Sequence, residues 1–191
     1  MPEWTDLALQ MSLRALTLVG FFLLFRALKR WPYLYALVWW PSTLVHEISH
    51  FLVGLLLAAH PTRLSALPRR DAQTHRWILG EVGFANLRWW NKLPVAIAPL
   101  LLMLPLGLWL ISTTLGMPYL SGPTLLLEWA ALQCLVGCWP SATDWAHALS
   151  ALLVLSGLAV LALLSLYGLL KFTPIGDHFE VLARLRPALG L

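Results

Sequence analysis

The sequence predicts an all-α polytopic membrane protein with a short β-hairpin, on the evidence of its composition, its long apolar segments and its tryptophans. The 191 residues are 59% hydrophobic and 12% charged, whereas a soluble domain carries about 25% charged residues. Several segments reach the roughly 20 apolar residues that a helix needs to cross a bilayer. The chain has eleven tryptophans, and tryptophan collects at membrane–water boundaries. We therefore expect one integral membrane domain over residues 1–191.

Five apolar segments are predicted to be transmembrane helices. They cover about residues 7–28, 33–59, 93–115, 124–139 and 148–170. The first segment contains Arg14 and could instead be a shallow helix in the membrane interface. The fourth is short and contains Glu128, so we expect it to be tilted or shielded by neighbouring helices.

The longest polar stretch, residues 60–92, separates the second and third segments. Its six basic residues outnumber Asp71 and Glu81, so the positive-inside rule favours a cytoplasmic loop. A second basic cluster at residues 26–30 would then lie outside, which leaves the orientation open. Residues 76–87 hold β-favouring side chains interrupted by glycines, a pattern that predicts a short membrane-associated strand pair.

The net charge of +4 indicates contact with lipid rather than with nucleic acid. The basic residues cluster in loops between apolar segments, where membrane topology and anionic headgroups account for them. The sequence has no RNA-binding motif and no basic helix. We expect the lipid bilayer, and not a nucleic acid, to be the partner of these charges.

Residues 46–50 read His-Glu-Ile-Ser-His inside the second apolar segment. On a helix, His46 and His50 share one face and both imidazoles can reach one metal ion. Glu47 lies beside them and could take a proton from a metal-bound water, whose pKa zinc lowers to about 7. Ionisable side chains at membrane depth are costly and therefore usually functional. The pattern is typical of a zinc hydrolase.

A catalytic zinc site needs a third protein ligand and an open fourth position. Asp144 is the first choice, because Pro140 breaks the helix before it and a carboxylate there could point inward. The alternative role for Asp144 is to begin the fifth helix as a cap. Glu128 and Glu81 remain open as third ligands.

Two further histidines, His147 and His60, are expected to lie outside the metal's ligand set. His147 could support Asp144 from outside the metal's ligand set. His60 is ten residues beyond His50, about 15 Å along a helix, which is too far for a ligand.

The chain resembles the site-2 protease family of intramembrane zinc metalloproteases. The resemblance rests on the apolar helix with His46, Glu47 and His50, and on the later Pro140 and Asp144. It covers residues 33–150 in order and spacing, with residues 76–87 where the family has a short β region. The family usually has Asn before its Pro and Gly after its Asp. Here no Asn precedes Pro140 and Trp145 follows Asp144, so we expect Asn86 or Asn91 to supply the amide that binds substrate.

The resemblance implies a membrane-embedded zinc metalloendopeptidase. Zn2+ is expected on His46, His50 and Asp144, with Glu47 activating a zinc-bound water. The implied substrate is a membrane-spanning or membrane-associated protein, and the implied location is the bacterial cytoplasmic (inner) membrane. The alternative is a catalytically inactive metal-binding membrane protein with a structural or partner-binding role, which a closed four-ligand site would indicate.

Overall fold

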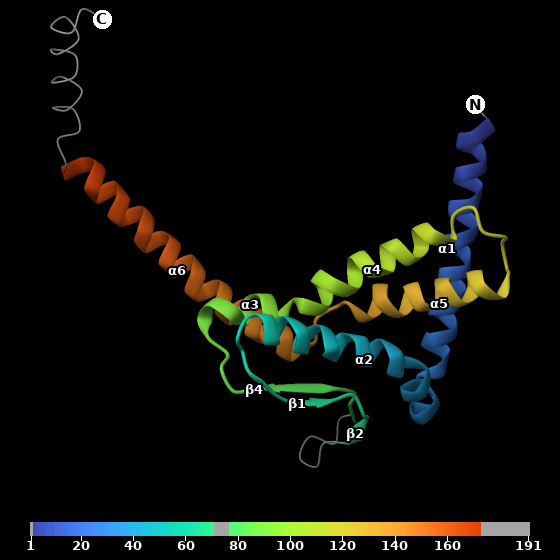
Figure 1. Ribbon diagram of the computed structural model, residues 1–191, viewed down its shortest axis with the longest axis horizontal. Coiled ribbons are helices and arrows are strands. Elements are labelled where there is room, and N and C mark those ends of the chain that lie inside the picture. Colours follow the sequence, from blue (N-terminus) through green and yellow to red (C-terminus); the bar gives the residue numbers. More distant parts are fainter. Residues whose placement is uncertain (1, 71–76, 173–191) are drawn as a thin grey trace, which may run out of the picture. The chain divides into compact units, whose positions relative to one another are not determined.

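The computed structural model describes residues 2–70 and 77–172. The described chain is mostly helical (74%) with two small two-stranded sheets, which confirms the predicted helical class. The helices are α1 (Pro2–Leu28), α2 (Pro32–Leu56), α3 (Trp89–Ala96), α4 (Ala98–Thr114), α5 (Gly122–Gly137) and α6 (Ala142–Phe172) (Figure 1). Residues 1–149 form one compact unit and residues 150–191 a second. The candidate site described below lies in the first unit.

Within the described residues, three of the predicted spans are long and apolar enough to cross a membrane. They are Asp6–Leu28, Trp89–Thr114 and Ala142–Leu169. α2 is long enough but carries His46, Glu47 and His50, which lower its mean hydropathy. α5 has only 16 residues, fewer than the about 20 that a perpendicular span requires.

Prolines divide the third predicted span into two helices. α3 ends at Ala96, Ile97 lies between the helices with a φ of −97° and a ψ of 10°, and α4 begins at Ala98. Pro99 stands near the start of α4, where a residue without an N–H is tolerated. The break interrupts the regular helical hydrogen bonds of the carbonyl groups at the end of α3.

Four strands form in the polar loop, which confirms a β-hairpin within residues 60–92, but the strands do not pair within residues 76–87 as predicted. β4 (Glu81–Phe84) pairs antiparallel with β1 (Pro61–Ser65), and β3 (Trp77–Ile78) pairs with β2 (Arg69–Arg70). The predicted pair within residues 76–87 is therefore wrong, because both strands of that segment belong to one arm of a longer hairpin. Its other arm, residues 61–70, begins with a proline and is rich in arginine, and so lacks the apolar alternation that predicts a strand.

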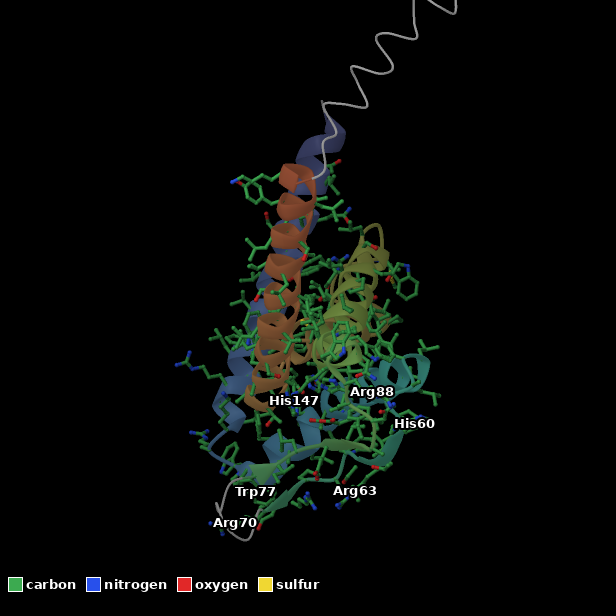
Figure 2. The ribbon with its side chains drawn as sticks, turned by 90° about the vertical axis from the view of Figure 1, so that its left-hand side faces the viewer. His60, Arg63, Arg70, Trp77, Arg88 and His147 are labelled. Atoms are coloured by element: carbon green, nitrogen blue, oxygen red, sulfur yellow. The ribbon has the colours of Figure 1, made fainter. Side chains whose placement is uncertain are left out.

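β1 and β4 lie along α2 (Figure 1). A Cβ on Gly54 of α2 would collide with the ring of Phe84 in β4. This close approach holds β4 beside the helix that carries the HExxH motif. In Figure 2, Arg63, Arg70 and Trp77 mark this strand region, whose basic side chains are exposed at Arg63 and Arg70.

Glycines allow α2, α4 and α5 to pack closely. A Cβ on Gly107 of α4 would lie 2.9 Å from the Leu135 side chain of α5, and one on Gly137 would overlap the Ser42 side chain of α2. Small residues at such contacts let helix backbones approach, which is how helices associate in membranes. The contact at Gly137 brings the end of α5 to the helix that carries His46.

A buried ion pair joins α1 to α5. Arg14 Nη1 lies 3.0 Å from Glu128 Oε1, and both side chains are almost fully buried. Arg14 also donates to the carbonyl oxygens of Thr114 and Met117, at 2.9 and 2.8 Å. The charge that weakened the first predicted span is thus neutralised inside the protein.

Candidate metal centre

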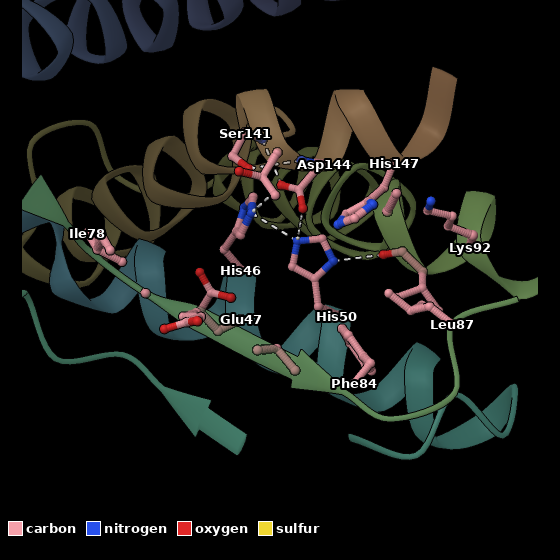
Figure 3. Close-up of a pocket in the computed structure, with 16 residues that line it drawn as sticks. His46, Glu47, His50, Ile78, Phe84, Leu87, Lys92, Ser141, Asp144 and His147 are labelled. Carbon is pink, nitrogen blue, oxygen red and sulfur yellow. Dashed lines mark hydrogen bonds and ion pairs between the residues drawn. The ribbon is translucent and has the colours of Figure 1, made fainter. Parts of the chain in front are cut away.

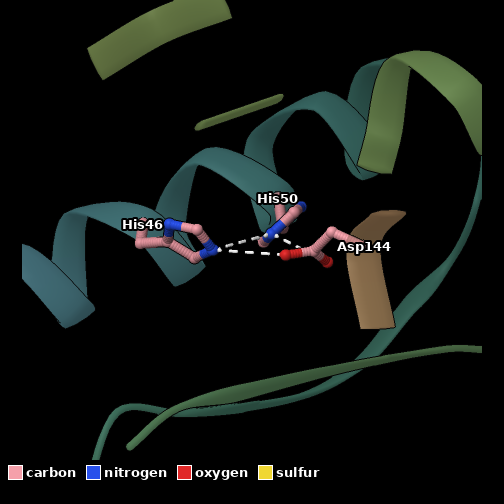
Figure 4. A group of neighbouring side chains, drawn as sticks. All are labelled: His46, His50 and Asp144. Carbon is pink, nitrogen blue, oxygen red and sulfur yellow. Dashed lines mark hydrogen bonds and ion pairs between the residues drawn. The ribbon is translucent and has the colours of Figure 1, made fainter. Parts of the chain in front are cut away.

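His46, His50 and Asp144 converge on one point. The two Nε2 atoms are 3.2 Å apart, and they lie 3.5 Å (His46) and 3.3 Å (His50) from the Asp144 carboxylate oxygens. Figure 4 shows both imidazoles projecting from α2 toward the aspartate at the start of α6. The side chains are 13%, 6% and 15% exposed, so little water screens the group.

The orientation of His50 follows from a proline. Its Nδ1 lies 2.7 Å from the carbonyl oxygen of Val95. In a continuous helix that carbonyl would accept from the N–H four residues later, but that residue is Pro99 and has no N–H. The freed oxygen accepts a hydrogen bond from His50 instead, which leaves Nε2 facing the cluster.

His46 is oriented in the same way by the end of α5. Its Nδ1 lies 2.7 Å from the carbonyl oxygen of Gly137, the last residue of that helix. Pro140 follows three residues later and prevents the helix from continuing. The N–H of Ser141, four residues after Gly137, is turned to the Asp144 carboxylate, so the Gly137 oxygen is available to His46.

Asp144 is held by a reciprocal cap at the start of α6. The Ser141 N–H donates to Asp144 Oδ2 at 2.8 Å, and the Asp144 N–H donates to Ser141 Oγ at 3.2 Å. This is the capping-box arrangement, with Ser141 as the cap. The capping alternative and the ligand alternative are therefore compatible, because the cap aims the carboxylate at the histidines.

These contacts leave only acceptor atoms at the centre of the cluster. A backbone carbonyl can only accept, so each Nδ1 carries a proton, and in a neutral imidazole the Nε2 then presents a lone pair. Two lone pairs and a carboxylate facing each other at 3.2–3.5 Å repel unless a positive charge lies between them. The residues therefore fit a cation.

The spacing of the donor atoms suits a tetrahedral metal. Zinc bonds of about 2.0–2.1 Å to nitrogen and oxygen place the ligand atoms of a tetrahedron about 3.3–3.4 Å apart. The three observed separations bracket this value. Among the described residues, no fourth histidine, cysteine, aspartate or glutamate joins the group.

Glu47 lines a cavity of about 490 Å³ beside the cluster (Figure 3). Its side chain is buried, and its carboxylate packs against Gly80, where any Cβ would collide with it. None of the described residues is hydrogen-bonded to this carboxylate. The carboxylate is thus next to the cavity and free to hydrogen-bond to a molecule in it.

The structure places the other candidate ligands apart from the cluster. Glu81 pairs with Arg69 on the strands, and Glu128 pairs with Arg14 between α1 and α5. His147 lines the cavity without joining the three donors. His60 lies beyond the end of α2, away from His147 in Figure 2.

Asn86 and Asn91 have structural contacts and do not line the cavity. The Asn91 side chain is fully buried and bonds to the backbone at Leu57, Asn86 and Arg88. The Asn86 side chain bridges Ala58 and Arg88. The predicted use of one of these amides for substrate binding therefore finds no support in their positions.

Comparison of the chain with protein-family models, with curated proteins and with solved structures finds no match.

Sequence reasoning missed the residues that complete the site. Lys92 on α3 lines the cavity, and Gly80 packs on Glu47, although the sequence placed both in a polar loop. The carbonyls of Val95 and Gly137 carry no side-chain signal at all. The prolines four and three residues after them, at positions 99 and 140, were the available clue.

Proposed function

We propose that the chain is a membrane-embedded zinc metalloprotease that resembles the site-2 protease family. The observation that carries this proposal is the convergence of three acceptor groups, His46, His50 and Asp144, whose other atoms are committed to the protein. Such a set needs a cation, and two imidazoles with a carboxylate are typical zinc ligands. A bound zinc ion would supply Lewis-acid activation of water and of the scissile carbonyl.

Glu47 is the proposed general base and acid. Its carboxylate lies beside the cavity and next to His46 in sequence. It takes a proton from water as the oxygen adds to the peptide carbonyl, then gives that proton to the amine as the C–N bond breaks. Positioned proton transfer of this kind contributes about 10²–10⁴-fold to a rate.

An extended segment of a membrane protein is the proposed substrate. A helical segment hides its carbonyls in its own hydrogen bonds, so it must unwind before cleavage. β4 pairs with β1 along one edge and contributes Glu81, Val82 and Phe84 to the cavity wall. Its second edge could add an extended peptide as a further strand.

The proposal includes five membrane crossings, two more than length and composition alone support. α2 and α5 pack on α4, so neighbouring helices shield their polar residues. Buried ionisable groups are tolerated in membranes when they face the protein interior. The bacterial inner membrane is the location that the family resemblance suggests.

The alternative function is a structural metal site in a catalytically inactive membrane protein. Structural zinc sites are closed by four protein ligands, whereas three donors beside a cavity with a carboxylate favour catalysis. The alternative predicts a metal without hydrolysis.

The test is Glu47→Gln, with Glu81→Gln as the matched control on the cavity wall. Both purified proteins are offered a mixture of synthetic membrane-spanning peptides in detergent, and cleavage products are identified by mass spectrometry. We expect Glu47→Gln to keep its zinc and lose at least about 100-fold in rate, with Glu81→Gln close to the wild type. Full activity in zinc-loaded Glu47→Gln would exclude the proposed mechanism.

A further inference from the structure

Lys92 brings a positive charge to the cavity wall. It is half-buried and lines the same cavity as the three donors and Glu47. Figure 3 shows Glu47 on one side of the donor cluster, and His147 and Lys92 on the other. A lysine is almost never fully buried without a counter-charge, and no carboxylate of the described residues forms an ion pair with this partly buried lysine.

The backbone fixes Lys92 relative to the cluster. It stands on α3 three residues before Val95, whose carbonyl orients His50. Its N–H continues the helix by donating to Arg88 at 2.9 Å. The short helix thus positions one histidine and one cation together, so that a ligand in the cavity meets both.

The three carboxylates that line the cavity already have other roles, and Glu81 is paired with Arg69. Asp144 is directed at both histidines, and Glu47 lies on the far side of the cluster from Lys92. The side chains of Asn86 and Asn91 are committed to the backbone. On the Lys92 side, an ammonium group is the charged donor that faces the cavity.

We propose that Lys92 binds an oxygen anion of the substrate on the side of the donor cluster opposite Glu47. The anion is either the scissile carbonyl oxygen, which becomes negative as water adds, or a carboxylate that the substrate carries. In the first case Lys92 donates an N–H hydrogen bond to that oxygen while Glu47 moves the proton from water to the leaving amine. This inference rests on the proposed function and adds a substrate-binding residue to it.

The first experiment measures binding without turnover. Zinc-loaded full-length protein in detergent is titrated calorimetrically with N-phosphoryl-leucinamide, which presents tetrahedral phosphoryl oxygens, and with N-acetyl-leucine, which presents a carboxylate. Wild type is compared with Lys92→Met, with Lys92→Arg, and with Lys29→Met as an exposed control in the turn between α1 and α2. We expect Lys92→Met to weaken one of the two probes by about 10–100-fold, and Lys92→Arg and Lys29→Met to bind near wild-type strength.

The second experiment separates the two sources of the anion. Peptides of the mixture that the wild type cleaves are used as substrates in two forms, one with free carboxylates and one with amidated carboxylates. If the scissile oxygen is the ligand, Lys92→Met lowers kcat by about 100-fold with either peptide and leaves KM nearly unchanged. If a substrate carboxylate is the ligand, the variant raises KM for the free acid alone.

The inference would be overturned, and the proposed function left standing, if zinc-loaded Lys92→Met bound each probe as tightly as the wild type and cleaved peptides with unchanged kinetics. Loss of zinc from Lys92→Met would also overturn it, since the lysine would then support the metal ligands. A wild type that holds no zinc, or an active Glu47→Gln, would instead remove the proposed function itself.

Discussion

His46 and His50 owe their orientation to carbonyl groups that prolines leave without a helical partner. Hydrogen bonds from a ligand's second nitrogen fix its tautomer and raise its basicity, and losing one typically costs 10–100-fold in metal affinity. The HExxH spacing therefore defines only half of the site. The rest depends on where α3 and α5 end.

Pro99→Ala tests this dependence for His50. The new N–H at position 99 can donate to the Val95 carbonyl and compete with His50 Nδ1. We expect zinc affinity to fall by about 10–100-fold, measured by competition with a chromophoric chelator. Pro105→Ala, at an exposed proline of the same helix, is the control and should bind zinc normally. The thermal midpoint of the metal-free protein reports any packing cost separately; unchanged zinc affinity in Pro99→Ala would contradict the account.

Gly80→Ala tests the position of Glu47. The added Cβ would overlap the Glu47 carboxylate, and displacing a catalytic group by about 1 Å can cost about 100-fold in rate. We expect a loss of that size in peptide cleavage, with zinc content unchanged because Glu47 is not a ligand. Gly83→Ala on the same strand meets Thr62 at 3.2 Å instead and serves as the control. Equal rates for the two variants would show that Glu47 does not act from its present position.

The contact between α1 and α5 depends on a charge pair rather than on apolar packing alone. Arg14 and Glu128 are buried together, while Arg14 Nε and Glu128 Oε2 have no hydrogen-bond partner among the described residues. Leaving one charge buried alone is costlier than removing both, typically by 3–5 kcal/mol for a broken pair. The pair also explains how α1 and α5 can each bury a charged side chain between them.

Arg14→Met and the double variant Arg14→Met/Glu128→Gln separate these effects. We expect the single variant to lose roughly 3–5 kcal/mol of stability and the double variant to recover most of it, by thermal unfolding in detergent. Glu128→Gln alone should retain its zinc, since Glu128 is committed to Arg14. A double variant less stable than the single one, or zinc lost with Glu128, would contradict this assignment.

At the scale of elements, the sequence located the helices better than the strands. Long apolar runs predict helices through their length and composition, and the strands β3 and β4 did fall within residues 76–87. Their partners, β1 and β2, did not, because strand pairing depends on contacts between residues far apart in the sequence and on packing against Gly54. His46, His50 and Asp144 could be grouped from the sequence by their spacing and the helix breaks. The position of Lys92 at the cavity could not be predicted, because it depends on how the chain turns into α3.

At the scale of the whole molecule, three helices of the described chain are long and apolar enough to cross a membrane. Extensive exposed leucine on α1 and α4 would be unfavourable in water, because burial of such surface contributes about 25 cal/mol per Å². We expect the protein to remain in the membrane pellet after alkaline carbonate extraction, followed by immunoblotting of an epitope-tagged chain. Release into the supernatant would contradict an integral membrane protein.

The zinc content of the freshly purified, detergent-solubilised protein tests the central claim most directly. Wild type is compared with His46→Ala, Asp144→Ala and Glu81→Gln by inductively coupled plasma mass spectrometry. The account predicts about one zinc per chain in wild type and Glu81→Gln, and its loss in the other two variants. Wild type without zinc after reconstitution would show that protons, not a metal, hold the three acceptor groups together, and would contradict the proposed protease.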